Sequence, residues 1–203
     1  MDGVLVDARE WHDVALNRAL NLFGISISRI DHLTTFDGLP TKNKLELLSI
    51  DRGFPKELHS FVNEMKQRYT MELIYTKCRP KFNHEYTLSS LKAKGYKLGV
   101  CSNSIRETVD TMMIFTALDR YLDVILSNQD VLSPKPNPEI YLKAISTLSL
   151  SPSECLILED NEHGIKAALA AGAHVLEITD PSDVELEVVL AEIARIDAFS
   201  KTA

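Results

Sequence analysis

Short apolar segments alternate with helical stretches between Lys97 and Ile196, and this alternation constrains the fold more than any other feature of the sequence. The segments are bounded by turn residues, as buried parallel strands usually are. They are Lys97–Cys101, Val124–Leu126, Cys155–Leu158 and Val175–Ile178. Amphipathic stretches follow them at Ile105–Phe115, Glu139–Leu148, Ile165–Ala171 and Val184–Ile196. Strands that alternate with helices predict an open parallel sheet with helices on its faces.

The preceding part of the chain reads as helical. Apolar residues from Trp11 to Phe23 fall at helical spacing, and Gly24 is a suitable C-terminal stop. Further helices are expected to begin near Thr41 and near Leu58. The run at residues 3–6 resembles the end of a buried strand that runs into a loop. We therefore expect a sheet domain formed by residues 1–8 and 81–203, and a helical domain inserted at residues 9–80.

Composition limits the classes of function. Apolar residues make up 45% of the chain and charged residues 25%, which is typical of a globular protein. The formal net charge of −7 argues against a nucleic-acid partner, because phosphate backbones are bound by basic surfaces. No apolar run approaches the roughly 20 residues of a membrane span, and no signal peptide is visible. The three cysteines lie far apart and are expected to be free thiols. These features predict a soluble, cytoplasmic protein with no membrane partner.

Polar motifs follow the predicted strands, at the edge where ligands bind in parallel sheets. Ser102 and Asn103 precede a helix, where they could bind an anion or merely cap the helix. Lys135 lies among three prolines, which predicts a stiff, exposed loop that holds a cation in place. Glu159 and Asp160 are adjacent carboxylates that suit a hard divalent cation, although Asp160 could also cap the next helix.

Four segments, taken in order, resemble motifs of the haloacid dehalogenase superfamily, in the branch of small-molecule phosphatases and β-phosphoglucomutase. They are D-G-V-L-V-D at 2–7, C-S-N-S at 101–104, S-P-K-P-N-P at 133–138 and L-E-D-N-E-H-G at 158–164. The resemblance covers essentially the whole chain. It implies an α/β three-layer sandwich with a Rossmann-like parallel sheet and an inserted helical cap.

The resemblance also implies a Mg²⁺-dependent phosphatase that acts through an aspartyl phosphate. Asp2 and Lys135 would be catalytic, since Asp2 matches the acid that protonates the leaving group. Ser102, Asn103 and Lys135 would bind phosphate. The implied ligands of Mg²⁺ are Asp2, Glu159 and Asp160.

The first motif of the family is D-x-D-G, and its first Asp attacks phosphorus. Asp2 matches the second Asp and Met1 matches the spacer, so the nucleophile maps to a position before Met1. The apolar strand that leads into this motif in the family also maps there. We therefore expect the 203-residue chain to be inactive, either because its start is truncated or because it is a pseudoenzyme that binds phosphate or a partner.

Specificity is expected to depend on the helical insertion. His12 resembles a histidine that β-phosphoglucomutases place near their substrate, and Gly38 and Thr41 fall in the expected specificity region. A phosphosugar mutase is therefore an alternative to a phosphatase. The expected partner is a small phosphorylated metabolite, and a monomer is expected because the motifs of one chain complete the site.

Overall fold

The computed structural model describes residues 1–36 and 39–200, which form two compact units. The sheet unit comprises Met1–Asp7 and Cys78–Ala203, and the helical unit is Ala8–Lys77. The boundaries expected from the sequence fall after residues 8 and 80, one and three residues further along the chain.

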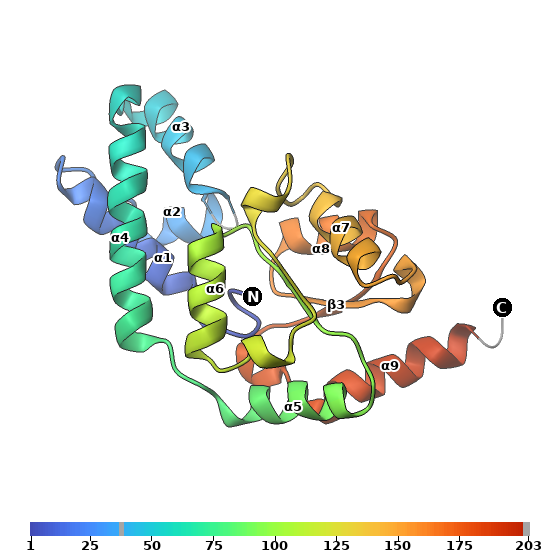
Figure 1. The fold of residues 1–203 in the computed structure, drawn as a ribbon. Coiled ribbons are helices and arrows are strands. Elements are labelled where there is room, and N and C mark those ends of the chain that lie inside the picture. The colour runs from blue at the N-terminus through green and yellow to red at the C-terminus, as the bar shows by residue number, and fades with distance from the viewer. Residues whose placement is uncertain (37–38, 201–203) are drawn as a thin grey trace. The chain divides into compact units, whose positions relative to one another are not determined.

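The helical unit is built around the packing of two helices, α1 (Arg9–Asn21) against α4 (His59–Lys77). Two further helices, α2 (Arg29–Thr34) and α3 (Thr41–Arg52), complete its described part (Figure 1). The periodicity that predicted α1, α3 and α4 is confirmed, whereas α2 was not expected. Side chains from these helices and the segments between them form one apolar cluster, which includes Leu16, Leu20, Leu45, Leu48 and Val62.

The sheet unit contains four short strands in its described part, each within two residues of its predicted position. They are β1 (Gly99–Cys101), β2 (Val124–Leu126), β3 (Leu156–Glu159) and β4 (His174–Glu177). Strand β1 pairs with β2 in parallel, and β3 pairs with β4 in parallel. Parallel strands joined through helices confirm the predicted α/β fold. In the described residues the two pairs form separate two-stranded sheets.

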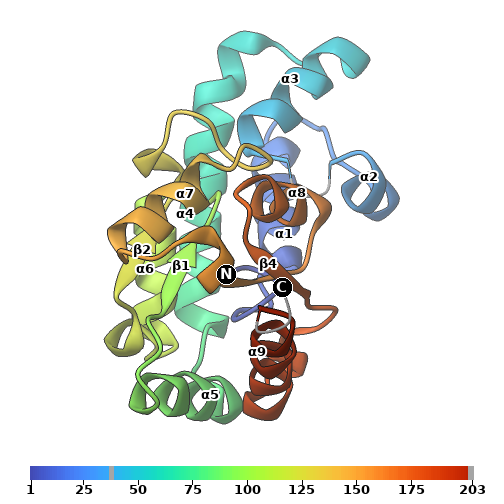
Figure 2. The same cartoon turned by 90° about the vertical axis from the view of Figure 1, so that its right-hand side faces the viewer.

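Helices cover both faces of the strands. In both views α7 (Glu139–Thr147) and α8 (Glu162–Ala170) lie on one side, and α5 (Phe82–Ala93) and α9 (Leu186–Ser200) lie on the other (Figures 1 and 2). Helix α6 (Arg106–Phe115) contacts β2. Helix α5 was not expected from the sequence. None of the helices in the described residues is both long enough and apolar enough to cross a bilayer.

Alternation along the strands assigns their side chains to two apolar clusters. Ile157 and Val175 pack into a cluster that includes Ile140 of α7 and Ala168 of α8. Their neighbours pack on the opposite face with residues of α5 and α9; these neighbours are Leu156, Leu158 and Leu176. Successive side chains of a strand point to opposite faces, so β3 and β4 pack against apolar residues on both sides, although most of their own side chains are only partly buried.

The first residues form a tight turn, so the strand end predicted at residues 3–6 is wrong. The backbone amides of Val4, Leu5 and Val6 all approach the Met1 carbonyl oxygen, at 3.3, 2.8 and 3.1 Å. Gly3 has a φ of +70°, a left-handed conformation that glycine adopts readily. The apolar side chains here are buried, which explains why the run resembles a strand by composition alone.

Candidate active site

The Asp2 carboxylate lies at the carboxyl end of β1, next to two serine hydroxyls. The Oγ atoms of Ser102 and Ser104 donate to Asp2 Oδ2 at 3.4 and 3.2 Å. Ser102 is buried, and its Oγ also accepts a hydrogen bond from the Ser104 backbone amide at 3.1 Å. The loop after β1 therefore brings two hydroxyls and an acid together.

Neither Ser102 nor Asn103 caps the helix that follows them. The N-cap residue of α6 is Ile105, and no side chain caps it. Asn103 instead holds the loop that carries Lys135: its Nδ2 donates to the Lys135 carbonyl at 3.2 Å, and its Oδ1 accepts from the Lys135 amide at 3.0 Å. The helix-cap alternative is thus wrong for these residues, and their proposed binding of phosphate stays a prediction.

Lys135 is buried, which corrects the expectation that it lies in an exposed loop. Its side chain is 7% exposed. The ammonium donates to the Cys101 carbonyl at 3.0 Å and to Glu159 Oε1, and it lies 4.6 Å from the centre of the Tyr141 ring. Burial of an ammonium is unfavourable unless an anion and hydrogen bonds compensate for the lost water. The three contacts provide that compensation, at the carboxyl ends of β1 and β3.

Tyr141 is a member of this cluster that sequence reasoning missed. Its hydroxyl donates to the same Glu159 oxygen that Lys135 contacts. Burial raises the pKa of the Tyr141 hydroxyl, and the neighbouring Glu159 carboxylate raises it further, so this hydroxyl remains a donor. In the sequence Tyr141 resembles any apolar residue of an amphipathic helix, and only its spacing of six residues from Lys135 could have drawn attention to it.

Glu159 is held as an anion by these donors. Burial, the largest single influence, favours the protonated form, but the attraction of Lys135 and of the Met1 amino group, together with the hydrogen bonds from Lys135 and Tyr141, keeps the pKa of the Glu159 carboxyl below its usual value. Gly164 gives the carboxylate its space, because a Cβ built there would lie 2.2 Å from Glu159 Oε2. Glu159 therefore neutralises the buried Lys135, and its assignment as a metal ligand is still a prediction.

Asp160 lies against the turn that carries Asp2. A Cβ built at Gly3 would lie 1.8 Å from Asp160 Oδ2, so only glycine leaves room for this carboxylate. Asn161 caps α8 by accepting from the Gly164 amide at 3.0 Å. The cap that the sequence offered as an alternative role for Asp160 thus belongs to its neighbour. Asp160 thus lies against Gly3, the neighbour of Asp2 in the chain.

The oxygen atoms of these acids are of the type that Mg²⁺ prefers, but the protein side chains alone do not complete its coordination. Among the residues that the structure describes, no group of three or more His, Cys, Asp or Glu side chains could hold a metal ion. Mg²⁺ is typically held by one or two protein carboxylates, with waters and substrate phosphates as its other ligands. Asp160 offers a carboxylate of this kind, and Asp2 offers its main-chain carbonyl. Their roles as ligands remain predictions.

The three candidate substrate residues belong to the helical unit. His12 lies in α1, where its Nδ1 accepts from Lys66 Nζ of α4 at 3.2 Å. Thr41 is the first residue of α3. Gly38 lies outside the described residues. The part that these residues play in binding substrate is likewise a prediction.

Comparison with known proteins gives this chain its family. Residues 1–178 match the family model described as haloacid dehalogenase-like hydrolase. The chain is 31% identical over 173 residues to phosphoglycolate phosphatase of Aquifex aeolicus, across 85% of this chain and 78% of that protein. It is 33% identical over 138 residues to pyrophosphatase PpaX of Bacillus velezensis, across 68% of this chain and 57% of that protein.

Solved structures share the fold. A HAD hydrolase of family IA, variant 3, from Entamoeba histolytica superposes with a TM-score of 0.81 at 20% identity, over 97% of this chain and 96% of that one. A putative β-phosphoglucomutase from Thermotoga maritima gives a TM-score of 0.72 at 21% identity, over 95% of this chain and 96% of that one. With its motifs at the carboxyl ends of parallel strands and a family match over most of its length, the chain belongs to the haloacid dehalogenase-like hydrolases.

Proposed function

We propose that this chain is the scaffold of a Mg²⁺-dependent phosphatase for a small phosphorylated metabolite. The observation that carries the proposal is the cluster of Asp2, Ser102 and Ser104 beside the buried Lys135. Phosphoryl transfer requires donors and cations fixed around phosphate oxygens, with an acid at the leaving group. The similarity to a phosphoglycolate phosphatase and to a pyrophosphatase supports phosphate chemistry.

Each residue has a distinct role in this proposal. Asp2 donates a proton to the leaving oxygen and later accepts one from the attacking water. Hydrogen bonds from Ser102 and from the loop at Asn103 hold the phosphate oxygens. Lys135 faces the developing negative charge with its ammonium, and Glu159 keeps that ammonium in place.

Asp160 and the main-chain carbonyl of Asp2 are the groups that would hold Mg²⁺, with Glu159 beside them. When bound, the ion would neutralise negative charge on the phosphate. Gly3 and Gly164 support this arrangement, because each leaves the space that one of the two adjacent acids occupies.

The proposed reaction also needs a carboxylate that attacks phosphorus and forms an aspartyl phosphate. In the family this acid stands two positions before the residue that matches Asp2, and residues 1–203 include no such position. Asp2 is not expected to replace it, because residues two apart in an extended chain lie roughly 6.6 Å from one another. The 203-residue chain by itself is therefore expected to hold phosphate without turning it over.

The proposed partner is a small molecule, and one chain is proposed to suffice for binding it. The net charge of −7 supports this choice over a nucleic acid, since a nucleic-acid site needs a basic surface. We propose no membrane partner.

The proposal is tested with three proteins. They are the 203-residue chain, the same chain preceded by an apolar strand and an Asp, and that extended chain with Asn in place of the added Asp. Release of phosphate from p-nitrophenyl phosphate, 2-phosphoglycolate and pyrophosphate is measured with and without Mg²⁺. We expect Mg²⁺-dependent turnover only in the chain with the added Asp.

Two results would count against this proposal. Strong Mg²⁺-dependent turnover by the 203-residue chain would require a different nucleophile. No turnover in any of the three proteins, together with retained binding of phosphate or vanadate, would favour a binding protein that performs no catalysis.

A further inference from the structure

Tyr141 contacts both members of the buried ion pair, each with a different part of its side chain. Its hydroxyl donates to Glu159 Oε1, and the centre of its ring lies 4.6 Å from Lys135 Nζ. Lys135 donates to the same Glu159 oxygen. All three side chains are buried, and a hydrogen bond between groups shielded from water is electrostatically stronger than the same bond in water. Tyr141 can therefore act on the ammonium through the carboxylate.

The two donors that converge on Glu159 Oε1 differ in stiffness. The last torsion of a glutamate side chain is broad and roughly two-fold, so the backbone does not fix which oxygen faces a partner. Lys135 carries its ammonium on a flexible four-carbon stem and could follow the carboxylate as it turned. Tyr141 has two side-chain torsions and a rigid ring, and its ring is buried on α7. The stiffer donor, Tyr141, thus determines where Oε1 lies.

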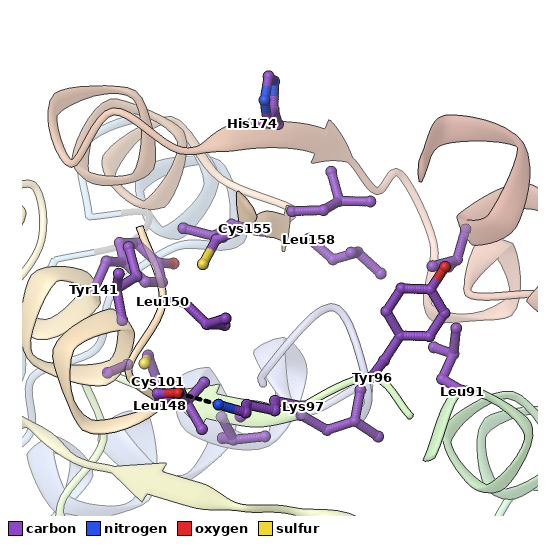
Figure 3. A pocket seen from close by; sticks show the side chains of 18 of the residues that line it. Leu91, Tyr96, Lys97, Cys101, Tyr141, Leu148, Leu150, Cys155, Leu158 and His174 are labelled. Carbon is purple, nitrogen blue, oxygen red and sulfur yellow. Dashed lines mark hydrogen bonds between the residues drawn. The ribbon is translucent and has the colours of Figure 1, made fainter. Parts of the chain in front are cut away.

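Packing confines the Glu159 carboxylate on one side. A Cβ built at Gly164 would lie 2.2 Å from Glu159 Oε2, so the carboxylate fits closely against α8. Glu159 and Tyr141 also line a cavity of about 630 Å³ between β1 and β3, and Figure 3 shows Tyr141 on the same side of this cavity as Cys101. In the part of the chain that the structure describes, packing from the cavity does not confine the carboxylate. Its hydrogen bonds take that part.

A second tyrosine of the sheet unit makes the same set of contacts at the surface. The Tyr121 hydroxyl donates to Glu85 Oε1 at 3.3 Å, and Arg120 donates to the same oxygen. The Arg120 guanidinium lies 5.1 Å from the centre of the Tyr121 ring. Here the side chains of Arg120 and Glu85 are 55% and 37% exposed, so water also solvates both charges. The two sets share their chemistry and differ in burial, which makes Tyr121 a matched control for Tyr141.

We propose that Tyr141 is a positioning residue, whose hydroxyl fixes Glu159 in the orientation that holds the Lys135 ammonium at the strand ends, ready for a phosphate oxygen. The contact with phosphate rests on the proposed function. The order that Tyr141 gives to Lys135 is a property of the chain without a ligand. Two separate measurements can therefore distinguish a failure of this inference from a failure of the proposed function.

The first measurement follows the Lys135 ammonium by NMR in the 203-residue chain with isotope-labelled lysines. Its hydrogens exchange slowly with water while they are buried and hydrogen-bonded, and Lys135→Arg identifies the signal. Tyr141→Phe removes the hydroxyl and keeps the ring. We expect it to speed the exchange of the Lys135 ammonium at least about tenfold, the factor expected for a hydrogen bond to a charged group. Tyr121→Phe should change this rate by less than about twofold.

The second measurement is the Kd for inorganic phosphate in the presence of Mg²⁺, by calorimetry. Tyr141→Phe should raise this Kd at least about tenfold, because the ammonium that meets the phosphate oxygen is no longer held in place. Tyr121→Phe should leave it within about twofold. Tyr141→Leu, which also removes the ring beside Lys135, should raise both the exchange rate and the Kd further than Tyr141→Phe does. If Tyr141→Leu fails to fold, the Phe variant decides alone.

A purely structural role for Tyr141 is excluded by an internal reference. Loss of global stability would speed the exchange of every buried hydrogen, including the backbone amides of α5. We expect these amides to change much less than the Lys135 ammonium in Tyr141→Phe. Equal acceleration of both would overturn the proposal in favour of a structural role.

Other results would overturn the proposal as well. Unchanged exchange of the Lys135 ammonium in Tyr141→Phe would mean that the hydroxyl does not order it. Faster exchange with an unchanged Kd would mean that the position of the ammonium does not matter to phosphate. If the unsubstituted chain binds no phosphate, the proposed function fails, and the exchange of the Lys135 ammonium still decides whether Tyr141 holds it in place.

Discussion

The carboxyl ends of β1 and β3 and the space between the same two strands are built in different ways. At the ends, buried side chains meet specific partners: Lys135 with Glu159, and Ser102 with Asp2. Between the strands, two backbone edges line an apolar cavity. The first arrangement forms through loops that hold one another, since Asn103 binds the Lys135 backbone. The second consists of strand edges and apolar side chains with no such specific partners across the cavity among the described residues.

The largest difference between the regions should appear when the buried ion pair is broken. Lys135→Met would leave the buried Glu159 carboxylate without its cation, and we expect the free energy of unfolding to fall by about 3–5 kcal/mol. Urea denaturation measures this change. The exposed Lys143, which donates to the Asp130 carbonyl, provides the control, since Lys143→Met should change stability by less than about 1 kcal/mol. Equal effects of the two substitutions would contradict the comparison.

The next effect is expected at Tyr141, which contacts both regions because it also lines the cavity. Tyr141→Phe removes one hydrogen bond to a charged group and keeps the ring over Lys135. We expect a loss of about 1.5–3 kcal/mol in unfolding free energy. In the double variant Tyr141→Phe with Glu159→Gln, the effect of the Tyr141 substitution should shrink. If it does not, the hydroxyl acts through another group.

Substitutions at two alanines compare the room for a larger side chain at the cavity with that in the packed interior of the same unit. Ala168 of α8 is fully buried in an apolar cluster, so Ala168→Leu should overpack it and lower stability by about 1–3 kcal/mol. Ala144 of α7 belongs to the same cluster but also lines the cavity, which gives a larger side chain room, so Ala144→Leu should leave stability unchanged or raise it by up to about 1 kcal/mol. Thermal unfolding of both variants gives the comparison. Similar losses would mean that the cavity walls are as rigid as the packed cluster.

The smallest expected effect is a dependence on pH through His84, a buried residue of α5. Burial lowers the pKa of this imidazole, although its Nε2 meets the Pro181 carbonyl at 2.6 Å. The neutral form is thus favoured in the folded state. In the unfolded chain the pKa of a histidine is about 6.5. The contribution of neutral His84 to the free energy of unfolding is therefore complete above about pH 6.5 and is lost as the pH falls below this value toward the lower pKa of the folded state.

Urea midpoints measured from pH 8 to pH 5 test this dependence. His84→Gln should flatten the decline of stability below pH 6.5 relative to the unsubstituted chain, whatever it does to stability at pH 8. The same substitution at His174, which is only half-buried on β4, is the reference for the slope of the decline. An unchanged slope in His84→Gln would remove His84 as its source.

Much of the fold could be predicted because the strands and helices of residues 97–196 carry their signals locally. Strand β2 was predicted at its observed bounds, and α6 within one residue. The turn at residues 3–6 could not be recognised from composition, because it depends on three amides that share the Met1 carbonyl. Which strands pair with which could not be read from the sequence either, since pairing of parallel strands is a long-range property.

The candidate site was predicted where a residue type is unusual for its position, and missed where it is ordinary. Lys135 was conspicuous among prolines, but its burial follows from Glu159, 24 residues away. Tyr141 was missed because an aromatic residue on the apolar face of a helix looks like any core residue. Asn103 was expected to face phosphate, and its contacts with the Lys135 backbone come from a loop distant in the sequence.

The burial of Met1 has a practical consequence for the design of fusions to residues 1–203. Met1 is 8% exposed and lines the cavity between the strand pairs. A flexible Gly/Ser linker joined directly to Met1 would begin in apolar surroundings, to which such a polar linker is poorly suited.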